Sequence, residues 1–140
     1  MLNEQEQYNE LAFYTLAHSD PGFIHQNAVN AFAAQTATEA DKPIRIAFAL
    51  VGLYLCVVKG RTGREVQLAH MRLARHRKSW PRFSPPADRG IIRVGDVIAA
   101  VPGAERDAMI RQWCESVWAA WSHVHGQIAA LCEKELGVLR

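Results

Sequence analysis

The sequence predicts an all-α fold, a single-domain bundle of five to six helices, from three observations. Helical periodicity, with apolar residues three and four positions apart, dominates the chain of 140 residues. No segment alternates polar and apolar residues convincingly, as a half-buried strand does. Apolar residues make up 49% and charged residues 21% of the chain, which is ordinary globular composition. We therefore expect residues 1–140 to form one helical domain around one core.

The first half of the chain predicts three helices. The first is expected over Glu4–His18, because Ser19–Asp20–Pro21–Gly22 interrupts the pattern there. Asp20 can cap a second helix that begins at Pro21 and runs to Ala37. The third, Pro43–Lys59, is apolar on nearly all sides and is expected at the centre. Its apolar run of 15 residues is shorter than the roughly 20 that span a membrane, so we expect no membrane partner.

The middle of the chain predicts a fourth helix followed by a long loop. Thr62 and Glu65 have the spacing of a capping box, and the helix after them is expected to end near Arg77. The Pro-rich loop, residues 78–93, has no helical or strand pattern. Four apolar side chains are expected to hold this loop against the core: Trp80, Phe83, Ile91 and Ile92.

The C-terminal third predicts a short helix over Val94–Ala100 and one long helix over Ala104–Leu136. Trp113, Trp118 and Trp121 lie on the long helix, where packing in the core is the simplest interpretation. An alternative is a homodimer that uses this Trp-rich helix as its interface.

The cysteines and the N-terminus predict a cytoplasmic protein. Cys56, Cys114 and Cys132 are far apart, and no CxxC pair indicates a zinc knuckle or a disulfide framework. Each lies in an apolar helical pattern, which is typical of a buried, reduced thiol. The start of the chain is acidic and polar, unlike a signal peptide.

Three stretches carry a resemblance to a known family: HSDPGFIHQNAVNAFAAQ, PIRIAFALVGLYLCVVKGRTGREVQLAHMRLA and KSWPRFSPPADRGIIRVGDVIAA. They resemble an uncharacterised bacterial family of helical domains, a domain of unknown function, over residues 8 to 125. The resemblance implies a small soluble bacterial domain and brings no established activity. Some relatives carry a cysteine pair before the helices, and any zinc role of that pair does not carry over because this chain lacks it.

Four histidines are expected on the inner faces of separate helices. They are His18, His25, His70 and His125. Imidazoles from different helices can hold a divalent metal such as zinc and leave one position open for water. Asp20 could orient an imidazole from the second shell. The alternative is that each ring only satisfies a local hydrogen bond and that Asp20 is a helix cap.

Basic side chains concentrate in the middle of the chain. Residues 59–93 hold ten basic and two acidic side chains, a balance of +8 in a chain whose net charge is +2. Arg64, Arg72 and Arg75 recur at helical intervals on the outer side of the fourth helix, with Trp80 and Phe83 after them. They are candidate ligands for an anion or nucleic acid, whereas the small net charge favours pairing within the protein.

These observations support three functional hypotheses. The first is a pocket lined by histidines that holds a divalent metal or a small ligand. The second is an anion-binding or nucleic-acid-binding surface on residues 61–78, with nucleic acid the less favoured partner. The third is a homodimeric interaction protein without catalysis. Whether the chain is an enzyme stays open, and a metal-dependent hydrolase is the enzyme class that the histidines would serve.

Overall fold

The apolar third helix lies at the centre of the fold, as its composition predicts. The computed structural model of the protein describes residues 2–18 and 20–137, which form seven α-helices and one 3-10 turn and contain no strand. The α-helices are α1 (Glu4–Ala17), α2 (His25–Gln35), α3 (Pro43–Val57), α4 (Gly63–His76), α5 (Val94–Ala99), α6 (Ala104–Ala120) and α7 (His125–Leu136). Nine residues of α3 are buried. In this part of the chain no helix has the length and apolarity needed to cross a membrane.

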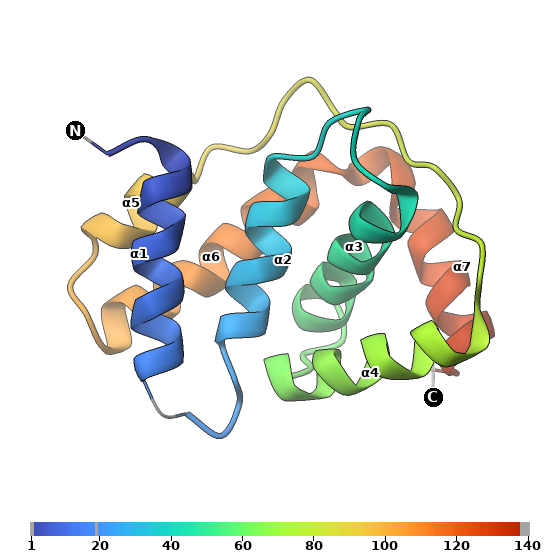
Figure 1. Ribbon diagram of the computed structural model, residues 1–140, viewed down its shortest axis with the longest axis horizontal. Helices are drawn as coiled ribbons and strands as arrows, with labels where there is room; N and C mark the ends of the chain where they lie inside the picture. Colours follow the sequence, from blue (N-terminus) through green and yellow to red (C-terminus); the bar gives the residue numbers. More distant parts are fainter. Residues whose placement is uncertain (1, 19, 138–140) are drawn as a thin grey trace.

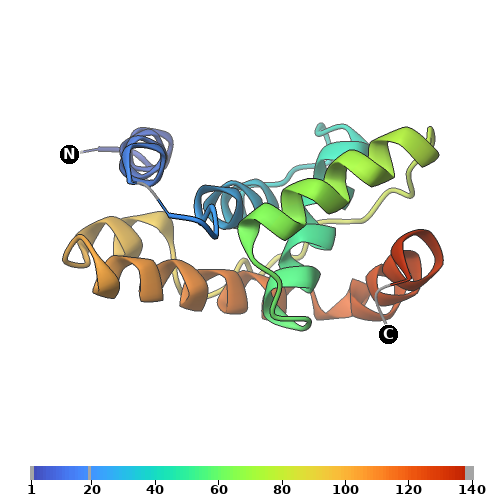
Figure 2. The ribbon, with the colours of Figure 1, turned by 90° about the horizontal axis from the view of Figure 1, so that it is seen from below.

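The helices form two layers around α3. Helices α1, α2 and α3 lie side by side, and α4 crosses near the end of α3 (Figure 1). Helix α6 runs along the opposite side of the molecule, beneath α1 and α2 (Figure 2), and packs against both α2 and α3. Helix α5 packs against both α1 and α6, and α7 packs against α3 and α4. This arrangement brings the turn before α2, the turn before α4 and the middle of α6 together.

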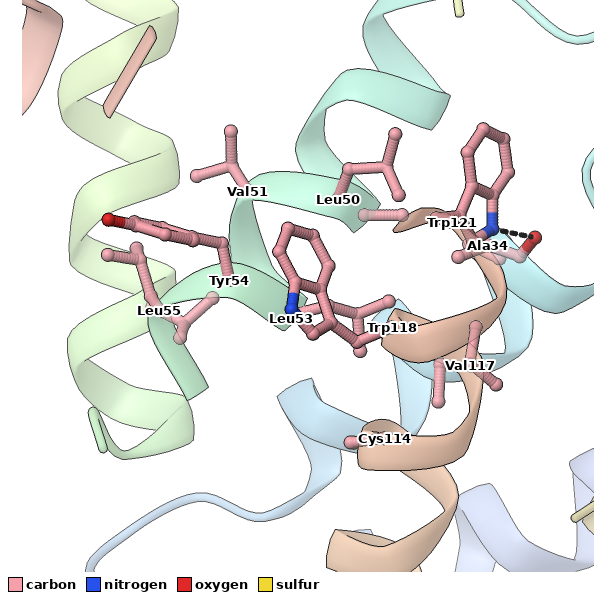
Figure 3. Close-up of a cluster of buried hydrophobic side chains, with 14 of the residues drawn as sticks. Ala34, Leu50, Val51, Leu53, Tyr54, Leu55, Cys114, Val117, Trp118 and Trp121 are labelled. Carbon is pink, nitrogen blue, oxygen red and sulfur yellow. Dashed lines mark hydrogen bonds between the residues drawn. The ribbon is translucent and has the colours of Figure 1, made fainter. Parts of the chain in front are cut away.

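Trp118 of α6 and Trp121, which directly follows this helix, lie among buried apolar side chains of α3 (Figure 3). Trp113 and Trp121 are 0% exposed and Trp118 is 6% exposed, so the rings are not available to a second copy of the chain. The indole N–H of Trp121 donates to the carbonyl oxygen of Ala34 at 3.2 Å and ties α6 to the end of α2. The core interpretation of these residues is confirmed, and a homodimer stays a prediction that would need another surface.

The long C-terminal helix expected over Ala104–Leu136 is two helices, which raises the number above the predicted five to six. Helix α6 ends at Ala120, the 3-10 turn η1 spans Ser122–Val124, and α7 follows. Trp121 leaves the helical conformation, with φ −94° and ψ 26°. Its buried indole fixes this position while the chain turns, which allows α7 to pack on α3 and α4. No proline or glycine marks the break, so no sequence signal predicted it.

The Pro-rich loop is held against the core, although partly by residues that the sequence did not suggest. Phe83 is buried as expected, whereas Ile91 is 89% exposed and contributes nothing to the core. The carboxamide of Gln35, at the end of α2, donates to the carbonyl oxygens of Arg89 at 3.0 Å and Ile92 at 2.7 Å. A buried glutamine therefore positions this loop through its backbone.

Candidate functional site

A polar pocket lies where the turn between α1 and α2 meets the turn between α3 and α4, with α6 as the third wall. Its volume is about 340 Å³, within the range of small-molecule sites. We call it the junction pocket. It is lined by Asp20, Gly22, Ile24, Asn27, Cys56, Gly60, Arg61, Thr62, Gly63, Asp107 and Arg111. The pocket thus unites the segment around Asp20 with the turn before α4, two stretches that are distant in the sequence.

The turn between α1 and α2 is held in an unusual backbone conformation. Phe23 has a φ of +55°, in the left-handed region that residues other than glycine rarely adopt. Helix α2 consequently begins at His25, and the prediction that it begins at Pro21 is wrong. Asp20 serves as a local cap, because its carboxylate accepts the backbone N–H of Ile24 at 3.0 Å. Strained backbone of this kind persists only where surrounding contacts fix it.

The first turn of α4 supplies those contacts. The capping box of Thr62 and Glu65 is formed, as predicted. The backbone N–H of Arg64 donates to the carbonyl oxygen of Gly22 at 2.9 Å. Gly63 is buried, and a Cβ at this position would overlap the carbonyl oxygen of Phe23. Glycine therefore permits the close approach that forms this wall of the pocket.

Charges of both signs line the pocket. Asp107 on α6 accepts the hydroxyl of Tyr14 at 3.0 Å, and Nε2 of His18 lies 3.4 Å from its other oxygen. Arg61 lies 3.7 Å from the glutamate of the capping box. Arg111 has no carboxylate within 4.0 Å among the residues that the structure describes. The carboxylates are thus held by protein groups, whereas this guanidinium is open to a ligand.

Asn27 and Cys56 are among the residues of the pocket wall that the sequence did not suggest as site residues. Asn27 is 7% exposed, and its Oδ1 atom has no hydrogen-bond partner in the described part of the chain. Leaving a buried acceptor unpaired costs on the order of 1–3 kcal/mol. Cys56 lies at the end of α3, and the thiol of Cys114 and the positive charge of Arg111 lower the pKa of its thiol despite partial burial.

The four histidines predicted as metal ligands each have a separate partner. Nδ1 of His25 lies 2.8 Å from Thr15 Oγ1, and His18 faces Asp107. The Nε2–H of His70 donates to the Phe48 carbonyl oxygen at 2.8 Å. The Nε2–H of His125 donates to the Trp118 carbonyl oxygen at 2.7 Å. In residues 2–18 and 20–137, no three His, Cys, Asp or Glu side chains are grouped to hold a metal ion. Burial lowers the pKa of His25 and of His70, which favours their neutral form. This geometry gives no support to a shared metal site, which stays an untested prediction.

The structure places the predicted site residues at different distances from the junction pocket. Asp20 lines it, although as a cap rather than as the partner of an imidazole. His18 does not line the pocket, but its imidazole lies beside Asp107, which does. None of these histidines lines the junction pocket, whereas His18 lines a separate pocket beside Tyr14 and Arg106. A ligand site lined by histidines stays a prediction.

The basic face of α4 is exposed, and the aromatic residues near it are occupied. Phe83 is buried in the core, and Trp80 packs edge-on against Phe48 with the Arg77 guanidinium over its ring. These rings are therefore not free to stack on bases. The three predicted anion ligands point to solvent: Arg64, Arg72 and Arg75.

Comparison with curated proteins and with solved structures finds no match. A family model, described as a family of unknown function (DUF5946), matches residues 5–122. This range includes both turns of the junction pocket and the part of α6 that lines it. It also agrees with the resemblance that the sequence motifs suggested. The chain therefore belongs to DUF5946, a family of unknown function.

Proposed function

We propose that the protein binds a small molecule with both an anionic group and an amino group, such as a free amino acid, in the junction pocket. The anionic group would lie at the guanidinium of Arg111, on the α6 wall of the pocket. An arginine binds a carboxylate or phosphate through paired hydrogen bonds. The amino group would lie toward Asp20 and Asp107, whose carboxylates line the same pocket.

The observation that carries this proposal is the guanidinium of Arg111, which lines the pocket and has no carboxylate within 4.0 Å in the part of the chain that the structure describes. Asn27 lies in the same wall, and its buried Oδ1 atom has no hydrogen-bond partner among the described residues. The strained turn at Phe23 supports the same location, because such strain is concentrated at functional sites.

A thermal-shift screen of free amino acids and related zwitterions tests the proposal. A ligand at about one hundred times its Kd stabilises the folded state by about 2.7 kcal/mol, which raises the Tm of a domain of this size by roughly 5–10 °C. Arg111→Ala is expected to abolish the shift. Arg75→Ala, on the exposed face of α4, is the matched control and should leave it intact. No shift with any zwitterion, or an equal shift with Arg111→Ala, would contradict the proposal.

A second candidate function is binding of a polyanion on α4. Its three exposed arginines make no ion pair with a carboxylate among the described residues, unlike Arg77 and Arg93. Retention on heparin that falls steeply with salt, and that is reduced by replacing Arg64, Arg72 and Arg75 together by alanine, is expected in this case. Retention that does not change with salt would exclude it.

A further inference from the structure

A second hollow, mostly apolar, lies where α4 meets the ends of α3 and α7. These three helices pack against one another, and Figure 1 shows the end of α7 beside α4. We call the hollow the apolar groove, and Leu55 of α3, Leu68 of α4 and Leu136 of α7 line it. Its volume is about 290 Å³, at the small end of the range for ligand sites. It therefore has room for a small ligand and not for a large one.

The surface of the groove is apolar and partly open to solvent. Leu55 and Leu136 are buried side chains at its base, and Ala69 adjoins them. Leu68 is 56% exposed, because the inward face of α4 is formed by Val66 and Leu73 instead. A ligand with a hydrocarbon chain would remove this leucine from water and extend the core outward.

The charged side chains of the groove favour an anion. Two arginines, Arg61 and Arg72, and one glutamate, Glu65, line it. The Glu65 carboxylate accepts the backbone N–H of Thr62 at 2.9 Å and lies 3.7 Å from the Arg61 guanidinium. Arg72 has no carboxylate within 4.0 Å in the part of the chain that the structure describes. One guanidinium beside the apolar surface is thus free to pair with a ligand.

We propose that the apolar groove binds a free medium-chain fatty carboxylate. Arg72 binds the carboxylate through paired hydrogen bonds, and the acyl chain lies over Leu68 and Leu136. The small volume selects a medium chain over a long one. The inference does not depend on the ligand of the junction pocket, although Arg61 borders both hollows.

Dependence on chain length separates this site from a polyanion surface on α4, which would also use Arg72. A polyanion contact follows the number of charges and the salt concentration. In the groove, each methylene group that is fully buried strengthens binding about fourfold, and each half-buried one about twofold. We therefore expect affinity to rise with the chain until the groove is filled.

Titration of the isotope-labelled protein with fatty carboxylates, followed by amide chemical shifts, tests the inference. The series runs from butyrate through octanoate to laurate, at concentrations below those at which micelles form. We expect the amides of residues 68, 69 and 136 to shift, and the Kd to fall about twofold or more per methylene group up to octanoate and to stop falling before laurate. Octylammonium has the same chain and the opposite charge, so we expect it to bind about tenfold more weakly than octanoate.

Two pairs of variants of exposed residues on α4 locate the ligand. Leu68→Gln should weaken octanoate binding about tenfold. Met71→Gln is its control, because Met71 is 50% exposed and does not line the groove. Arg72→Gln should likewise weaken binding about tenfold, whereas Arg75→Gln, outside the groove, should not.

Several results would overturn the inference. Equal affinity for butyrate and octanoate would show that no acyl chain is bound, and octylammonium that binds as tightly as octanoate would exclude the role of Arg72. Equal losses in Arg72→Gln and Arg75→Gln would indicate a diffuse basic surface instead. Binding to vesicles of anionic phospholipid without saturable binding of octanoate would assign the groove to a membrane surface. The ligand series on the wild-type protein decides these points if a variant fails to fold.

Discussion

Gly63→Ala tests whether the start of α4 holds the strained turn that forms the junction pocket. The added methyl group would overlap the carbonyl oxygen of Phe23, in a position with no flexible side chain to move aside. Overpacking of this kind costs typically 1–3 kcal/mol. The shift would also weaken the hydrogen bond between Arg64 N–H and Gly22, at a cost of about 1 kcal/mol. The higher helix propensity of alanine offsets up to about 1 kcal/mol of this cost. We therefore expect the free energy of unfolding to fall by about 2 kcal/mol.

Urea unfolding followed by circular dichroism measures this loss directly, because the slope and midpoint give the free energy of unfolding. Gly126→Ala is the matched control. It lies in α7 with open space around its Cα, so the same change should stabilise the protein by about 0.5 kcal/mol. If Gly63→Ala is as stable as the wild type, the close approach of α4 to the turn is not what holds Phe23, and the account of the pocket wall is wrong.

Three further predictions concern the rest of the fold. Asp20→Ala should lower the free energy of unfolding by about 0.5–2 kcal/mol in urea titrations, because it removes the oxygen that accepts the backbone N–H of Ile24. Asp20→Asn keeps such an oxygen and should cost less. An equal loss of stability in the two variants would contradict this role. Burial lowers the pKa of His70, so its contribution to the free energy of unfolding should be complete above the pKa of an unfolded histidine, about 6.5. Below that pH the free energy of unfolding should fall, by at most about 1.4 kcal/mol per pH unit for this group. His70→Gln should reduce this dependence on pH, and an unchanged slope would refute the assignment. Trp121→Phe should cost about 1–3 kcal/mol in thermal unfolding, since it leaves the buried Ala34 carbonyl without its donor; a neutral effect would show that the bond is not needed.

Local signals predicted much of the fold. The capping box at Thr62, the apolar composition of α3 and the helix start expected at Ala104 depend on residues close in the sequence, and the structure has helix boundaries at or near each. The break at Trp121 could not be predicted in this way. It depends on the contact of its indole with Ala34, which is 87 residues away in the sequence. Tertiary packing decided this boundary against the local propensity.

The candidate site was harder to predict than the fold. Helical phase gives the direction in which a histidine points, but not its height along the bundle, so inward-facing rings can reach separate partners. Arg111 and Cys56 meet only because α3 and α6 pack together, and neither carries a motif. One signal was available: Asn27 and Asn30 lie three residues apart within the apolar pattern of α2, and both have a buried atom without a partner.

Chemical-shift mapping during titration with a free amino acid tests the central claim most directly. We expect the backbone amides of residues 20, 22–24, 61–63 and 111 to shift together and to saturate with one affinity. The amides of the outer face of α4 and of α7 should stay in place. Shifts centred on α4 and α7, or saturating concentrations of every zwitterion that move no amide around the junction pocket, would contradict the claim that this pocket binds a ligand.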